Sequence, residues 1–151
     1  MHMRFRILRG LRGQEGSAAI EFAISLPFLI LLAIGVADFG RLYVVALATA
    51  NAAKAGAQYG AQTNGTTGDA AGIDQAARND AGNVGLQSVT STQICKCSDG
   101  TTPACTGTCP GYGVPQVFVE VRTTNTVSFA LRYPGLPQSV LVIRTVTMRV
   151  Q

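Results

Sequence analysis

Histidine is almost absent from this sequence: the only one among 151 residues is His2. Histidine is the commonest general acid or base in enzymes and a frequent zinc ligand, so the chain beyond this residue has none for either role. The sequence also contains no P-loop and no G-x-G-x-x-G, H-E-x-x-H or G-x-S-x-G motif, and its later carboxylates are scattered without a visible pair. These absences argue against an enzyme, and no motif calls for a cofactor or a metal.

Charge is missing from one long stretch, because no Asp, Glu, Lys or Arg lies between Glu21 and Asp38. With Ser17 to Ile20 added, this apolar segment reaches the roughly 20 residues that a helix needs to cross a bilayer. A charged side chain costs roughly 2.5 to 3.5 kcal/mol near the bilayer centre and less near one end. We therefore expect a membrane span over about residues 17–37, in which Glu21 calls for a specific reason.

The charges before this segment are mainly positive and predict its orientation. Four arginines are opposed by Glu15 alone: Arg4, Arg6, Arg9 and Arg12. The positive-inside rule places such an N-terminus in the cytoplasm and everything after Asp38 on the other side. Removing residues 1–16 would reduce the net charge from +4 to near +1. No basic stripe with interleaved aromatics remains, so we expect no nucleic-acid partner.

A short motif stands at the start of the apolar segment. Gly16 is followed by the small residue Ser17, with Glu21 at the fifth position after the glycine and Phe22 next to it. This arrangement resembles the processing site of type IV prepilins. The resemblance extends, over roughly residues 13 to 60, to the TadE-like minor pilins or pseudopilins of tight-adherence (Tad) pili, through matches at Pro27, Asp38–Arg41 and Asn51–Ala57.

The resemblance implies how the chain would be processed, assembled and located. A prepilin peptidase would cut between Gly16 and Ser17 and would methylate the new amine. Such a peptidase requires glycine before the cut, because the cleavage site leaves no room for a side chain there. The amine of one subunit would then meet Glu21 of another during assembly, so the implied partners are other pilin subunits, the Tad assembly machinery and membrane lipid. The implied location is the bacterial inner membrane, as a single-pass protein, or the pilus and cell surface, with a role in adhesion.

Three other interpretations fit parts of the same sequence. The apolar run could belong to a secretory signal cut after Ala48–Ala50, but that site lies some 13 residues beyond the run. An uncleaved signal anchor explains insertion but not Glu21, unless this side chain merely snorkels to the interface. The alternative of another class is an uncleaved single-span membrane protein that carries an exported, disulfide-bonded binding domain.

Helical periodicity continues beyond the membrane segment and predicts one helix over residues 17–62, roughly 70 Å long at 1.5 Å per residue. Pro27 lies inside it, and would either kink it or be tolerated, as proline often is in membrane helices. Residues spaced by three or four form one stripe along the helix, and their side chains become smaller toward its end: Phe39, Leu42, Ala46, Ala50, Ala53, Ala57 and Gly60. Small residues at this spacing allow close approach, either of a neighbouring helix or of the chain's own globular part.

The remaining residues, 63–151, predict an extracytoplasmic α+β domain. A turn capped by Asn64 or Gly65 in the left-handed conformation would end the long helix, and Asp69 would cap a short helix running to Asn79 or Asp80. Alternating patterns then predict strands, weakest for the first: residues 86–94, 116–129 and 139–150. We expect three or four antiparallel strands beside the long helix, with Arg144 at an edge.

All four cysteines are crowded into the loop 95–109: Cys95, Cys97, Cys105 and Cys109. Outside the cytoplasm disulfides are the expected state, although zinc binding and a redox-active pair are alternatives. The C-x-C and C-x3-C spacings differ from the usual zinc pattern. Cys95 and Cys97 are too close to favour each other, so each should pair with Cys105 or Cys109, in either arrangement.

Overall fold

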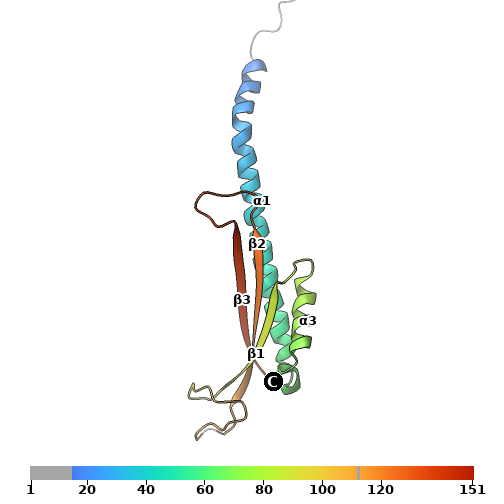
Figure 1. The fold of residues 1–151 in the computed structure, drawn as a ribbon, viewed down its shortest axis with the longest axis vertical. Coiled ribbons are helices and arrows are strands. Elements are labelled where there is room, and N and C mark those ends of the chain that lie inside the picture. The colour runs from blue at the N-terminus through green and yellow to red at the C-terminus, as the bar shows by residue number, and fades with distance from the viewer. Residues whose placement is uncertain (1–14, 112) are drawn as a thin grey trace, which may run out of the picture. The chain divides into compact units, whose positions relative to one another are not determined.

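The computed structural model of the protein describes residues 15–111 and 113–151, which divide into two compact units after Asp38. The four leader arginines and His2 lie outside the described residues. The elements, in chain order, are α1 (Glu15–Gly60), α2 (Asn64–Thr67), α3 (Ala70–Ala81), β1 (Ser88–Lys96), β2 (Gln116–Ser128) and β3 (Ser139–Arg149) (Figure 1). This order confirms the α+β class and the long apolar N-terminal helix.

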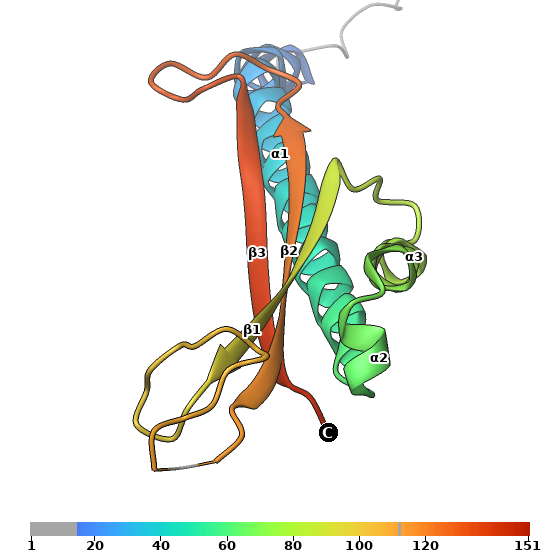
Figure 2. The ribbon, with the colours of Figure 1, turned by 60° about the horizontal axis from the view of Figure 1, so that its bottom comes forward.

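The C-terminal unit, Phe39–Gln151, contains a three-stranded antiparallel sheet in the order β1-β2-β3. Figure 2 shows the strands running along the later part of α1, with α3 nearest to β1. The central strand β2 alternates between buried and more exposed positions, so one of its faces belongs to the core. In the edge strand β3, Val142 is buried and Arg144 is exposed, which confirms the expected edge position.

Close approach between α1, α3 and β2 depends on glycines in α1. A Cβ added at Gly60 would lie 3.0 Å from Ile73 of α3 and 3.0 Å from Val119 of β2, and one at Gly56 would lie 3.2 Å from Val121. Ile73 is completely buried with both valines in one apolar cluster. The small residues of α1 are therefore what lets one isoleucine fill the junction of three elements.

Two threonines carry the polar contact between the sheet and α1. The hydroxyl of Thr123 in β2 donates to the backbone carbonyl of Thr49 at 2.9 Å, and the hydroxyl of Thr49 donates to the carbonyl of Val45 at 2.7 Å. Both threonines are completely buried. Because a buried hydroxyl without a partner is costly, these bonds favour one register of β2 against the helix.

The start of α3 is organised by Asp69, as the sequence predicted. One carboxylate oxygen accepts from the backbone N–H of Gly72 at 3.0 Å, and the other accepts from the hydroxyl of Tyr59 in α1 at 2.8 Å. The Gly72 N–H and then the Tyr59 hydroxyl hold the pKa of Asp69 below its ordinary value. A Cβ at Gly72 would overlap the carboxylate of Asp69 and the ring of Tyr59, so these side chains would have to move if the glycine were replaced.

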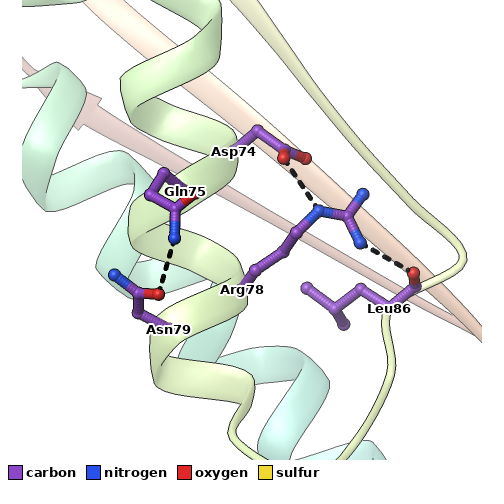
Figure 3. Close-up of polar contacts among 5 residues, drawn as sticks. All are labelled: Asp74, Gln75, Arg78, Asn79 and Leu86. Atoms are coloured by element: carbon purple, nitrogen blue, oxygen red, sulfur yellow. Dashed lines mark hydrogen bonds and ion pairs between the residues drawn. The ribbon is translucent and has the colours of Figure 1, made fainter.

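Arg78 links the end of α3 to the start of the sheet (Figure 3). Its Nε atom pairs with Asp74 one turn earlier at 2.8 Å, while its Nη1 atom donates to the backbone carbonyl of Leu86 at 3.1 Å. Beside it, Gln75 donates to Asn79 at 2.8 Å. The Asp74 and Gln75 bonds are exposed and should add little to stability, whereas the partly buried bond to Leu86 holds the connection between α3 and β1 against the helix.

The expected turn after α1 is wrong in its detail. Residues Asn64–Thr67 form the short helix α2 in place of a left-handed cap at Asn64 or Gly65, and α1 ends at Gly60. Thr63 caps α2: its hydroxyl accepts from the backbone N–H of Thr66, whose hydroxyl accepts from the N–H of Thr63. This reciprocal capping box satisfies backbone N–H groups at the start of α2, so a new helix can begin soon after α1 ends.

Candidate processing and assembly segment

The residues of the prepilin-like motif lie at the start of α1, with Gly16 and Ser17 exposed in its first turn. Ser17 and Glu21 are four residues apart, which puts them on the same face of the helix, one turn from each other. Within the described residues, the carboxylate of Glu21 has no hydrogen-bond or ion-pair partner. A helix N-terminus carries partial positive charge, so this geometry suits a carboxylate close to a terminal amine.

Ser25 lies one further turn along the same segment. Its hydroxyl donates to the backbone carbonyl of Glu21 at 2.9 Å, so this polar side chain is satisfied within the helix. Pro27 follows inside α1, which remains helical on both sides of it. Of the two polar side chains Glu21 and Ser25, only the carboxylate of Glu21 therefore lacks a partner within the described residues.

Most apolar side chains of the N-terminal unit are not covered by the chain. Apart from the partly buried Ile34, the large ones from Ile20 to Val36 are 39–71% exposed. The most apolar window of α1 has a mean hydropathy of 2.3 and none of it is buried. In the described part of the chain, α1 is the one helix whose length and composition allow it to cross a membrane. Exposure of this much apolar surface calls for lipid or another apolar partner.

The small-residue stripe behaves differently at its two ends. Ala53, Ala57 and Gly60 are buried within the C-terminal unit, where Ala57 joins the cluster of Ile73 and Val119. The later part of the stripe therefore packs on the chain's own globular part and not on a neighbouring helix. Phe39 at the start of the stripe is instead half exposed, at 51%.

The structure joins Cys95 to Cys105 and Cys97 to Cys109, one of the two arrangements that the spacing left open. Both bonds lie at one end of the sheet, because Cys95 is the last residue but one of β1 and Cys97 directly follows Lys96, where β1 ends. Backbone bonds from Cys97 to Thr101 and from Cys109 to Gly113 complete the loop. With these pairs formed, no thiolate of the loop is left to bind a metal.

The structure thus defines a chain in which a helix long and apolar enough to cross a membrane precedes a small disulfide-bonded α+β unit. The comparison with known families is more specific: residues 16–58 match the family model described as TadE-like protein. This match confirms the resemblance found in the sequence, and it begins at Gly16 and ends within α1. None of the curated proteins and none of the solved structures matches this chain.

Proposed function

We propose that this chain is a minor pilin or pseudopilin of a Tad-type pilus, made as a prepilin and assembled through its N-terminal helix. One observation carries the proposal: the TadE-like match begins at Gly16, one residue after the start of an apolar helix in which Glu21 has no partner among the described residues. A prepilin peptidase would cut between Gly16 and Ser17. The protein would then sit in the inner membrane with its N-terminus in the cytoplasm and its C-terminal unit outside, and would contribute to adhesion from the pilus or cell surface.

Cleavage would give Glu21 the partner that it lacks. It creates an α-amino group on Ser17, at the positive end of α1 and four residues from the carboxylate. Within one chain the two charges lie one turn apart along the helix, whereas in a stack of subunits the amine of one chain can meet the glutamate of the next. An ion pair in a medium of low dielectric is strong, and an unpaired charge there is costly, so this contact would set the register between subunits.

A second candidate function is favoured by the packing of the small-residue stripe. Because Ala53, Ala57 and Gly60 are covered by the C-terminal unit itself, this part of α1 is not available to a neighbouring helix. A single-span membrane protein that keeps its leader, and exposes a disulfide-bonded binding unit, would use α1 in this way. The two functions differ at the N-terminus, because only the pilin function requires the cut before Ser17.

Replacing Glu21 tests the proposed assembly contact. Glu21→Leu should leave membrane insertion unchanged or improved, because the span becomes more apolar. Glu21→Gln keeps the size of the side chain and removes only the charge. We expect both variants to insert normally and to abolish pili or surface adhesion, measured by electron microscopy and attachment assays in the native host.

The matched control is Ser25→Ala, which removes a polar side chain one turn further along without touching the carboxylate. This variant should assemble like the wild type. Normal pili with Glu21→Leu would contradict the ion-pair role of Glu21, whereas equal loss in Ser25→Ala would show that any polar change in this segment disrupts the protein.

A further inference from the structure

The C-terminal unit contains a cavity of about 460 Å³ that the proposed function does not use. Its wall combines three segments that are far apart in the sequence: the part of α1 around Arg41, the connection after α3 at Asn83–Gly85, and the end of β2 at Asn125–Val127. Gly40 and Gly85 contribute backbone without side chains, and a Cβ at either would meet open space. The cavity thus has room for a group larger than a few waters.

The polar groups of the cavity favour an anion. Arg41 supplies a guanidinium, which makes no ion pair or hydrogen bond with any residue that the structure describes, and no carboxylate lines the cavity. The side-chain oxygen of Asn125 accepts from the backbone N–H of Thr126 at 2.8 Å, which leaves the amide NH2 of Asn125 to donate. Asn83 adds a second amide. A guanidinium with neighbouring amide donors is well suited to phosphate oxygens.

The rest of the wall is apolar. Val44 and Val45 of α1 stand with Val84 and Val127 beside the polar groups. A free phosphate ion would gain nothing from these side chains, whereas a phosphodiester attached to a glycerol and acyl chains would bury part of its apolar surface on them. The lining as a whole therefore fits the polar end of an amphiphile better than a small inorganic anion.

The position of the cavity along the sequence points to the same ligand. The α1 residues that line it, Gly40 to Val45, follow Asp38 by two to seven positions, and Asp38 is the first charge after the apolar run. At 1.5 Å per residue this is about 3 to 10 Å of helix. The headgroup layer of a bilayer extends about 5 to 7 Å beyond the hydrocarbon core on each side. Phospholipid headgroups are thus the molecules present at this depth.

We propose that this cavity binds the phosphodiester headgroup of an anionic phospholipid, with Arg41 as its main contact and the amides of Asn83 and Asn125 as additional donors. A lipid held in this way would fix the depth at which the C-terminal unit rests on the membrane. The inference requires that α1 crosses a bilayer, but it requires neither cleavage at Gly16 nor pilus assembly, so it can fail or succeed independently of the pilin role.

The test uses the full chain, purified in mild detergent and exchanged into nanodiscs or mixed micelles of defined lipid. Native mass spectrometry would count the lipids retained with phosphatidylglycerol, which is anionic, and with phosphatidylcholine, which is zwitterionic. A third arm replaces lipid with inorganic phosphate. We expect the wild type to retain phosphatidylglycerol in preference to phosphatidylcholine, and Arg41→Gln to reduce this preference about tenfold, which corresponds to about 1.4 kcal/mol.

Arg149→Gln is the matched control, because it removes the same charge from the opposite end of the sheet, where Arg149 pairs with Phe118. It should retain lipid like the wild type, and Arg41→Lys, which keeps the charge, should lose less than Arg41→Gln. Circular dichroism would confirm that each variant is folded. The proposal is overturned if Arg41→Gln and Arg149→Gln lose lipid equally, if neither loses any, or if inorganic phosphate binds as tightly as the lipid does.

Discussion

The parts of α1 before and after Asp38 differ in which surroundings their side chains suit. Before Asp38 its side chains are mostly apolar, and the large ones from Ile20 to Val36, apart from the partly buried Ile34, are left exposed by the chain. After Thr49 they are mostly alanine and glycine, and Ala52, Ala53 and Ala57 are completely buried. The first part must obtain its burial from lipid or other chains, whereas the second part obtains it from the sheet and α3.

This difference separates two sources of stability. The free energy of unfolding of the C-terminal unit should depend on its own apolar clusters and disulfides, because the contacts that define them lie within residues 39–151. The apolar part of α1 should contribute to insertion and assembly instead. Substitutions of the same chemical kind should consequently have unequal effects on the two sides of Asp38.

The largest difference is expected from the same change, isoleucine to alanine, at two sites. Ile73→Ala removes a completely buried side chain at the junction of α1, α3 and β2, and should lower the free energy of unfolding by about 3 kcal/mol. Ile24→Ala removes one that is 65% exposed and should leave that quantity unchanged. Thermal and urea unfolding of the full chain in detergent, followed by near-ultraviolet circular dichroism, measures both. Equal destabilisation would remove the distinction between the two parts.

A somewhat smaller effect is expected from removing one disulfide. Cys97→Ser combined with Cys109→Ser opens a loop closed over a sequence separation of 12 residues, which should cost about 2 to 3 kcal/mol. Membrane insertion should not change, because residues 16–38 contain no cysteine. Unfolding with and without reductant would measure the cost, and alkylation with mass spectrometry would show whether the wild type has free thiols. Four alkylated thiols without reductant, or one bound zinc per chain, would contradict the disulfides.

The smallest effect concerns pH. The bonds from Gly72 and Tyr59 lower the pKa of Asp69 in the folded chain, so its contribution is complete above its ordinary pKa of about 3.9 and is lost as pH falls further. Asp69→Asn keeps an acceptor that suits a helix N-cap but cannot ionise. The difference in melting temperature between wild type and variant should therefore be constant at neutral pH and shrink below about pH 4. A difference independent of pH would show that the charge of Asp69 contributes nothing.

Much of this architecture could be predicted from residue patterns that act locally. The absence of charge from 22–37 marks the part of α1 that is apolar enough to cross a membrane, Asp69 marks the start of α3, and alternation marks β2 and β3 within one residue of their ends. Arg144 also revealed the edge strand, because a charge on an apolar face requires access to water. These signals depend on neighbours in sequence, which a single chain displays directly.

The features that could not be predicted depend on contacts between distant segments. The small residues of α1 allow close packing without specifying a partner, and only the fold shows that Ile73 and Val119 occupy that space. The cavity at Arg41 combines residues from three separate segments, of which Asn83 and Asn125 carry no distinguishing pattern of their own. The helix α2 did have a local signal, Thr63 and Thr66 at capping-box spacing, but threonine in place of glutamate or glutamine at the third position concealed it.

The N-terminus of the mature protein tests the proposed function most directly. N-terminal sequencing and intact mass of protein isolated from the native host distinguish a processed subunit from an anchored one. The pilin proposal predicts a chain that begins at Ser17, with a methylated amine. A protein that still begins at Met1 in cells with an active prepilin peptidase would contradict the proposal and favour the single-span membrane protein with an exported binding unit.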